Sequence, residues 1–445
     1  MTEDICYARV IIEGELTTLS DLHVGAASQP LPMGEDEPEN HIMRDCLGQP
    51  FIPGSSLRGL LRAIIGSDSN AGRELFGQAR LTDAEKAGKL RVYDAHITQC
   101  VALPMRTRIE KNPVTGAAED KHLIHDRVVP RGSRFLVSLQ GDGLRHSHVE
   151  ALLQALQGLN GAAQGRLGSG KSIGRGRLNW RLKKASGLDS EALNAWLYGD
   201  DSLEKARWTA MNPPDEAMSD SDFISWRLRL VFDEPVLVND PSIVSGEKGD
   251  PDLRYLREDG KLLVTGASLK GLFRGRIRRI LMTMTGGDED MSDKLIGKMF
   301  GSGDGISQWW FDDLLAPVES VHEQAIIAVD RFTGGVKDGA MLNLEAAVAG
   351  PSETQIHARA DAPGWQQLLW LYALRDAMEG DLNIGWGAAR GFGAFRAEYL
   401  DGGGESKTWE EVLDKYRSKI AAWDNQLQDK LTEAEGPATG EEDAA

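Results

Sequence analysis

Apolar and polar residues alternate along this chain in two similar series, one in each half. In the first half, two-residue alternation predicts strands and a 3.6-residue period predicts helices. The strands are expected at 8–16, 90–95, 134–139 and 177–182, and the helices at 56–65 and 149–157. The second half predicts strands at 226–232, 308–311, 325–329 and 393–399, and helices at 268–282 and 365–378. Both halves therefore follow the order strand, helix, strand, strand, helix, strand.

Short motifs recur at matching places in the two halves. PGSSLRG at 53–59 returns as TGASLKG at 265–271, an offset of 212 residues (265 − 53), and later landmarks keep offsets up to 224 (300 − 76). A fixed long period indicates a duplicated domain. The order of elements is that of a ferredoxin-like (RRM-like) module, so we expect an α+β protein with two such domains in tandem.

Glycine, proline and polar runs predict the boundaries of these domains. We expect a first domain at 1–184, a linker with a short helix (190–197) at 185–222, a second domain at 223–400, and a tail at 401–445. The tail is predicted to hold a charged helix at 408–431 and an acidic, disordered end.

Composition narrows the class of protein. A chain of 445 residues exceeds the size at which one core keeps growing, and its three cysteines argue against a disulfide framework or a four-thiolate zinc site. No apolar run approaches the roughly 18 residues needed to cross a bilayer, and the first residues lack the basic region of a signal peptide. We expect a soluble, cytoplasmic protein without a membrane partner.

The net charge of −18 conceals two basic stretches. Eight basic residues lie between Arg254 and Arg279 against two acids, and seven between Arg166 and Lys184 against none. Basic stretches on an acidic body are typical of a protein that binds a polyanion at defined places.

One of these stretches contains GRLGSGKS (165–172), which matches the nucleotide-binding pattern GxxxxGK[ST]. A true phosphate-binding loop leaves a strand and opens a helix, whereas here a helix is predicted before it and a strand after it. We therefore interpret it as a glycine-rich basic loop, mirrored at 385–393, in which Lys171, Arg175 and Arg390 contact a phosphate backbone. The alternative is a tight helix-to-strand turn.

The openings of the first helix in each half predict a second kind of anion contact. Ser55, Ser56 and Ser268 lie at helix N-termini, where free amides attract anions, and Ser55 or Ser56 is the expected cap. Basic residues follow at a spacing of four, on one helix face, without acids to pair with them: Arg58 and Arg62 in the first helix, and Lys270, Arg274 and Arg278 in the second. The alternative is a solvated basic face.

Together these motifs resemble the RAMP superfamily, whose members form the backbone of type III CRISPR effector complexes. The resemblance covers both domains and rests on LHVG (22–25), the paired helix openings, the segment VDRFTGGVKDGAML (329–342) and the two glycine-rich loops. It implies a fusion of two backbone subunits that binds guide RNA, complementary target RNA and other subunits of the complex. It also implies a β-hairpin thumb in each domain, at 108–128 and 330–347, with an apolar tip that enters the base stack.

The resemblance further implies cleavage of target RNA by a carboxylate on the loop after the first strand. Asp252 is the expected residue in the second domain, with Asp250 as an alternative, and Asp36 in the first, where Glu35, Glu37 and Glu39 compete. Attack by a 2′-hydroxyl needs a carboxylate that holds a divalent metal or assists proton transfer, so Asp36 and Asp252 are expected to bind Mg²⁺ or Mn²⁺. The general alternative is a solvated loop carboxylate.

Three further RNA contacts are expected: His23, which fits the family's position at the end of the first strand, Arg331 in the second thumb, and Trp386 in the late glycine-rich loop, which we expect to stack on a base. His23 has packing as its alternative role. Two rival functions remain: a non-catalytic scaffold of the same family, and a nuclease that processes guide precursors, which would favour a catalytic histidine.

Overall fold

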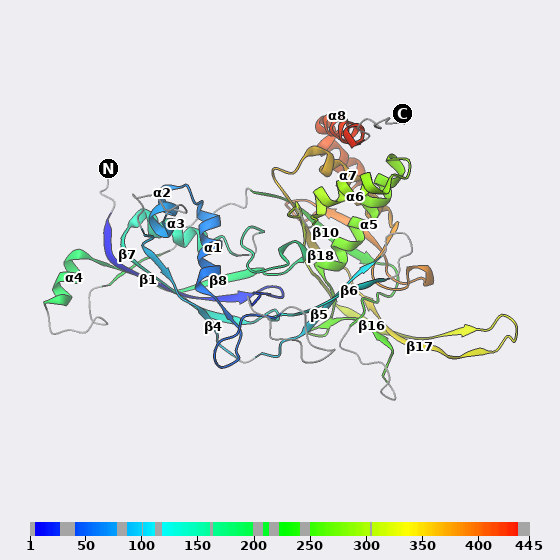
Figure 1. Ribbon diagram of the computed structural model, residues 1–445, viewed down its shortest axis with the longest axis horizontal. Helices are drawn as coiled ribbons and strands as arrows, with labels where there is room; N and C mark the ends of the chain where they lie inside the picture. Colours follow the sequence, from blue (N-terminus) through cyan, green and yellow to red (C-terminus); the bar gives the residue numbers. More distant parts are fainter. Residues whose placement is uncertain are drawn as a thin grey trace, which may run out of the picture. The chain divides into compact units, whose positions relative to one another are not determined.

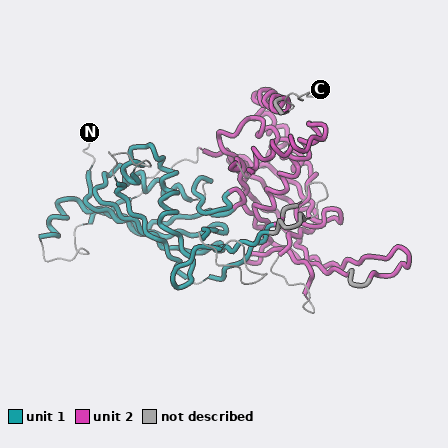
Figure 2. The backbone as a smooth tube through the Cα atoms, in the orientation of Figure 1, with its two compact units in different colours: residues 1–108, 122–171, 175–221 teal, residues 109–121, 172–174, 222–445 magenta. Residues whose placement is uncertain are grey.

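The computed structural model describes residues 5–26, 41–77, 87–99, 101–111, 118–160, 163–198, 208–212, 222–240, 250–302 and 305–434. The chain divides into two compact units (Figure 2). Unit 1 comprises residues 1–108, 122–171 and 175–221, and unit 2 comprises residues 109–121, 172–174 and 222–445.

Unit 1 is built on one sheet with the strand order β2-β4-β7-β1-β8-β9, with β3 also paired to β7. Central strand β1 pairs antiparallel with β7 and β8 along nearly its whole length. The strands are β1 (Cys6–Thr18), β2 (Phe51–Ile52), β3 (Leu90–Val92), β4 (Ala95–Ile97), β7 (Arg134–Arg145), β8 (Leu178–Asp189) and β9 (Thr209–Ala210).

In the described part of unit 1 the first and third helices pack on this sheet, the second packs on those two helices, and a fourth follows β8. They are α1 (Gly54–Ile65), α2 (Asn70–Phe76), α3 (His146–Gln157) and α4 (Ser190–Leu197), and a 3-10 turn, η1, spans Lys171–Ile173. Leu57, Leu61, Leu152 and Leu153 bring the helices onto inward-facing strand residues such as Ile12. Burial of this stripe is the main force that holds the helices to the sheet.

Unit 2 repeats this plan with a sheet of order β14-β18-β10-β20-β19, with β21 paired to β20. Its strands are β10 (Phe223–Phe232), β14 (Trp309–Phe311), β18 (Ser352–Arg359), β19 (Leu382–Asn383), β20 (Ala394–Leu400) and β21 (Ser406–Lys407). Its helices are α5 (Gly266–Met284), α6 (Glu289–Phe300), α7 (Gly364–Glu379) and α8 (Trp409–Ala434), and a 3-10 turn, η3, spans Ala388–Arg390.

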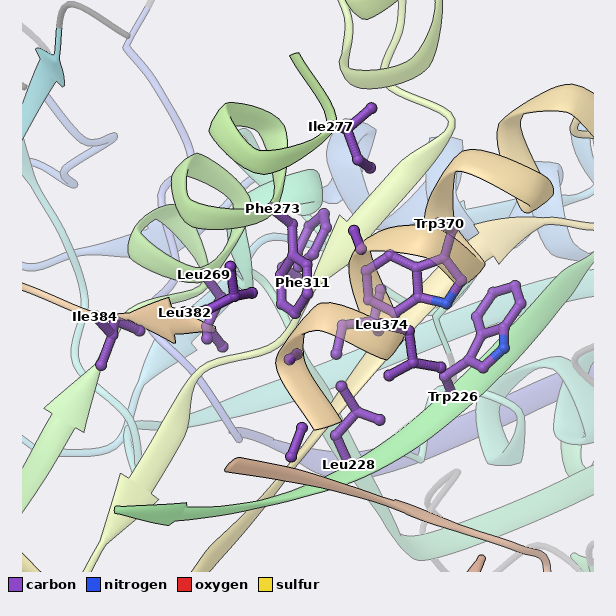
Figure 3. Packing of buried hydrophobic residues seen from close by; sticks show 14 of the residues in the cluster. Trp226, Leu228, Leu269, Phe273, Ile277, Phe311, Trp370, Leu374, Leu382 and Ile384 are labelled. Atoms are coloured by element: carbon purple, nitrogen blue, oxygen red, sulfur yellow. The ribbon is translucent and has the colours of Figure 1, made fainter. Parts of the chain in front are cut away.

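Aromatic side chains dominate the core of unit 2 (Figure 3). Trp370 of α7 lies 4.8 Å from the ring of Phe273 on α5 and 5.1 Å from that of Trp309 on β14, measured between centroids. Helix α8 closes the outer side of α7 with Trp423 and Leu427, which are both buried.

Two further groups of strands belong to hairpins and loops that extend from the main sheets. β5 (Met105–Lys111) and β6 (Ala118–Arg127) form a two-stranded sheet, while β16 (Val318–Val329) and β17 (Val336–Ala349) form a long hairpin (Figure 1). β11 (Leu253–Arg254) joins β17, and β12 (Arg257–Glu258), β13 (Lys261–Val264) and β15 (Leu314–Ala316) form a small sheet.

Three expectations about elements were wrong. The strand expected at 325–329 is part of hairpin strand β16, and the third main strand of unit 2 is β18, which carries few large apolar residues. The boundary expected at 184 falls inside β8, because β8 continues its pairing with β1 as far as Asp189. The first helix has Pro53 at its N-cap, with no side-chain cap from Ser55 or Ser56.

The order α3, glycine-rich loop, β8 confirms that no α-helix opens at Gly170-Lys171-Ser172, so this loop lacks the structure of a nucleotide-binding loop. Within the described ranges, no helix has the length and apolar character of a membrane span.

Candidate nucleic-acid interface and cleavage loop

Three predicted functional segments of unit 2 converge on the chain that follows β10. Val236 bridges Ala347 of hairpin strand β17, and Asn239 bridges Tyr255 next to the predicted cleavage loop. The amide of Trp386, in the late glycine-rich loop, donates to the carbonyl of Leu237 at 2.7 Å. Carboxylates, hairpin and glycine-rich loop therefore belong to one region of this unit.

Asp252 is tied to the hairpin by two hydrogen bonds. Its amide donates to the carbonyl of Asn343, and its Oδ2 accepts the Asn343 amide, each at 2.8 Å. Asp250 is more exposed, with 48% of its side chain accessible, and its Oδ1 lies 3.6 Å from Nη2 of Arg254. The carboxylate of Asp250 is therefore more accessible to solvent than that of Asp252.

Oxygen donors at Asp250 and Asp252 suit Mg²⁺ or Mn²⁺, since Mg²⁺ is commonly held by one or two carboxylates together with substrate phosphates. They do not form a complete protein cage. Among the described residues, the one set of three ligand atoms close enough to enclose a cation is Asp376, Glu379 and Asp381, at the end of α7. Arg276 pairs with Asp376 at 2.6 Å, which explains this acidic group as part of an internal ion-pair network.

The β16–β17 hairpin exposes an apolar face. Ile327 lies opposite Met341 and Val329 lies opposite Val336, and all four side chains are about half exposed. At the tip, Phe332 is 98% exposed, beside the exposed Arg331. Soluble proteins rarely leave such a surface uncovered, which makes these side chains a candidate binding surface.

The turn at the hairpin tip is held by Asp330. Its Oδ1 accepts the amides of Phe332 and Thr333, each at 2.9 Å. These hydrogen bonds lower the pKa of Asp330, and the one from the amide of Thr333 has the largest effect. The aromatic ring at the tip is thus presented by an ordered turn.

Trp386 and Arg390 form a pair on the surface of the late glycine-rich loop. The guanidinium carbon of exposed Arg390 lies 4.9 Å from the centroid of the half-buried Trp386 ring. A guanidinium over an indole is a favourable cation–π contact. The pair combines a ring for stacking with a charge for phosphate.

The basic residues of α5 have different surroundings. Arg278 is buried and its Nε donates to Asp293 Oδ1 of α6 at 2.6 Å, which raises the pKa of Arg278. Lys270 donates to the hydroxyls of Ser172 and Ser307, and Ser268 contacts the capping residue Thr265. The expectation of one free basic face is wrong for Arg278, because its guanidinium closes an internal ion pair, whereas Arg274 stays exposed.

Helix α1 shows the same division. Arg58 donates to the carbonyls of Leu90 and Phe76, so its guanidinium supports the fold of unit 1. The side chain of Arg62 is half-buried, Ser55 is exposed and Ser56 is half-buried.

The first amide of each of these two helix openings already has a carboxylate partner. Gly54 donates to Asp94 Oδ1 in α1, and Gly266 donates to Asp313 Oδ1 in α5, both at 2.7 Å. A Cβ on either glycine would lie 2.2 Å from a backbone oxygen, which explains why glycine stands at both positions. The sequence did contain a signal for these hydrogen bonds. An aspartate follows the second strand expected in each half, Asp94 in the first and Asp313 in the second, at an offset of 219 residues (313 − 94).

The early glycine-rich loop lies against the end of β1. The amide of Ser169 donates to the carbonyl of His23, and His23 Nδ1 lies 2.9 Å from the carbonyl oxygen of Arg127. His23 is 5% exposed, which fits its alternative role in packing. Arg175 is also buried, and its Nη1 lies 2.6 Å from Asp126 Oδ2. The expectation that Arg175 contacts a phosphate backbone is therefore wrong, because its guanidinium is enclosed in this ion pair.

Lys171 is the partly accessible cation of this loop. Desolvation lowers its pKa, and the charge of Arg166 adds to the effect. An anion placed here would offset both unfavourable contributions.

Asp36 lies outside the described residues. The flanking bridges of unit 1 still relate its loop to that of unit 2, since Gly25 bridges Ile42 as Asn239 bridges Tyr255. In sequence, Asp252 stands five residues before Arg257 (257 − 252), whereas Asp36 stands eight before Arg44 (44 − 36) and Glu39 five (44 − 39).

Comparison with known proteins identifies the family. A curated relative, "CRISPR system Cms endoribonuclease Csm3" of Methanocaldococcus jannaschii, is 37% identical over 57 residues, 13% of this chain. The match spans 22% of that relative's own length. The sequence profile of the RAMP superfamily matches residues 15–179 and again residues 199–396. The two matches cover most of the chain, one in each half, and the chain therefore belongs to the RAMP superfamily.

Proposed function

We propose that this chain is a guide-RNA-binding backbone subunit of a type III CRISPR ribonucleoprotein, which positions complementary target RNA and cleaves it. The observation that carries the proposal is the convergence, in unit 2, of an exposed apolar hairpin, a carboxylate loop and the Trp386–Arg390 pair. The strand orders of both main sheets support two ferredoxin-like domains.

RNA binding would use shape and charge. Single-stranded RNA is bound by stacking on aromatic rings and by basic residues along its backbone, which Trp386, Arg390 and Arg331 provide. The apolar hairpin tip suits insertion between bases, because unstacking exposes apolar base faces for Phe332 to cover. The acidic remainder of the chain would repel RNA elsewhere.

Cleavage would use the carboxylates at the base of the hairpin. In the proposed reaction a 2′-hydroxyl of the target attacks the adjacent phosphorus and the 5′-oxygen leaves with a proton. Asp252, or Asp250 beside it, would orient that hydroxyl or hold Mg²⁺ or Mn²⁺. A bound divalent cation supplies charge neutralisation at the phosphate. The word "endoribonuclease" in the relative's name supports this part of the proposal.

The test is to express the chain with the other subunits encoded beside it and to sequence the RNA that copurifies. We expect short RNAs that share a repeat-derived end, and cleavage of a complementary RNA in Mg²⁺ or Mn²⁺ that stops with chelator. Guide RNA without cleavage would favour the scaffold function. Processing of a guide precursor by the purified chain alone would show a precursor-processing nuclease and would overturn the proposed function.

A further inference from the structure

A short parallel ladder attaches the cleavage loop of unit 2 to its hairpin. Leu253 and Arg254 of β11 pair with Leu344 and Glu345 of β17. The amide of Tyr255 donates to the carbonyl of Glu345 at 3.0 Å, and Asp252 adds its two bonds to Asn343. These contacts hold the carboxylate loop directly against β17.

Arg254 lies at the centre of this attachment. Its Nε donates to Glu345 Oε2 at 2.6 Å, and its Nη2 lies 3.6 Å from Asp250 Oδ1. Its carbonyl accepts the amide of Asp240 at 2.8 Å. The hydrogen bond to Glu345 is the largest cause of the raised pKa of Arg254, and Asp250 and Asp240 add to it. One guanidinium thus offsets the charges of three neighbouring carboxylates.

The charge balance gives this arginine a role that a neutral residue cannot fill. The side chains of Arg254 and Glu345 are 17% and 23% exposed, so their ion pair is partly shielded from solvent. Without it, Asp240, Asp250 and Glu345 would repel one another, and only the backbone ladder and the bonds of Asp252 would hold the loop to β17.

We propose that Arg254 is a positioning residue for target cleavage: paired with Glu345, it holds the carboxylate loop against the hairpin, so that RNA seated on the hairpin meets the carboxylates in one geometry. The inference rests on the proposed function. It adds a coupling between the RNA-binding hairpin and the reacting groups. Such coupling matters because a misplacement of about 1 Å can cost on the order of 100-fold in rate.

The first test uses Arg254→Gln and Glu345→Gln in the assembled complex. We expect single-turnover cleavage at the unit 2 site to fall at least about 10-fold, while target affinity changes less than about 2-fold, since these residues act on the reaction and not on RNA contacts. The matched control is Arg396→Gln, which removes an exposed ion pair between Arg396 on β20 and Asp233 after β10 and should leave the rate unchanged.

Charge reversal separates a positioning role from simple loss of folding. Arg254→Glu and Glu345→Arg should each reduce cleavage, and the double variant should recover part of it, because the contact between positions 254 and 345 is rebuilt with opposite polarity while the new carboxylate at 254 lies beside Asp240 and Asp250. Failure of the double variant to recover any activity would contradict the pairing.

Hydrogen exchange gives a readout that does not require cleavage. In Arg254→Gln, amides 252–255 should exchange faster than in the wild type, while amides 314–316 in the neighbouring small sheet should not. Unchanged exchange at 252–255 overturns the inference. A wild-type complex that never cuts RNA overturns the proposed function, and it is distinguished by absence of product while the exchange difference persists.

Discussion

The arginines of this chain fall into two groups by what their guanidinium groups touch. Arg175 and Arg278 are buried and close ion pairs inside their own units. Arg274, Arg331 and Arg390 are exposed, and Arg390 lies over the ring of Trp386. Because a phosphate must reach the charge, the exposed group contains the better candidates for contact with RNA.

Two substitutions at Asp252 separate its hydrogen bond to the hairpin from its expected role in cleavage. Asp252→Asn keeps an oxygen that accepts the Asn343 amide but loses the charge, whereas Asp252→Ala loses both. If the carboxylate takes part in chemistry, both variants abolish one cut while target binding persists, and the alanine variant alone also exchanges faster at residue 343. Cleavage by Asp252→Asn at the wild-type rate would transfer the chemical role to Asp250, to be checked with Asp250→Asn.

Lys171 gives a pH-dependent prediction for stability. Its pKa in the folded protein is lowered, so the charged form disfavours folding below that pKa, and this cost is lost as pH rises from the lowered pKa to the ordinary value. Lys171→Met should therefore raise the melting temperature slightly near pH 7. The gain should shrink toward pH 10, as followed by thermal unfolding at several pH values, and a gain that grows with pH would contradict the sign.

At the scale of elements, long periodic segments could be predicted and non-local pairings could not. The helix expected at 268–282 is α5 over Gly266–Met284, because its apolar residues recur on one face. β18 was missed because Ile356 is its one large aliphatic residue, and its place between β10 and β14 is set by pairing. The convergence of the cleavage loop with the hairpin likewise depends on contacts about 90 residues apart (345 − 254).

Helix α5 predicts different outcomes for two arginines that share one face. Arg274→Glu should weaken guide RNA binding and reduce the salt dependence by about one counterion, without loss of stability. Arg278→Ala should lower stability by about 1–3 kcal/mol, because it removes a charged hydrogen bond to Asp293. Salt titration of RNA affinity and thermal unfolding measure the two effects, and exchanged outcomes would contradict the assignment.

At Phe332, on the tip of the β16–β17 hairpin, we expect a substitution to affect RNA binding without changing the stability of the fold. Since the ring is 98% exposed, Phe332→Ser should change the free energy of unfolding by less than about 0.5 kcal/mol. It should nevertheless reduce target binding or shift the cleavage position. Ile306→Ser, at another exposed apolar residue of unit 2, is the control and should do neither.

For the whole molecule, duplication explains why the same devices occur twice. Gly54 donates its amide to Asp94, and Gly266 donates its amide to Asp313. The two units therefore make the same glycine–aspartate hydrogen bond at corresponding positions. The sequence alone predicted the repeat, but not the hydrogen bonds, because glycine and aspartate lie about 40 residues apart (94 − 54).

Two units predict two cuts. If both loops are active, target RNA should be cut at two positions one subunit step apart in Mg²⁺ or Mn²⁺. Variants at Asp252 should remove one product. Asp36→Asn or Glu39→Gln should remove the other, and the pair identifies which carboxylate acts in the first loop. A wild-type product pattern in the Asp252→Ala, Asp36→Asn, Glu39→Gln triple variant would place the cutting elsewhere.

The apolar face of the β16–β17 hairpin also governs how the free chain behaves as a colloid. Ile327, Val329, Phe332, Val336 and Met341 form an adhesive patch that copies of the chain would share if they met. The net charge of −18 keeps copies apart at low ionic strength, and added salt screens that repulsion over about 10 Å at 0.1 M. The RNA-free chain is thus expected to stay dispersed in dilute buffer and to cluster as salt rises, with RNA acting as its dispersant.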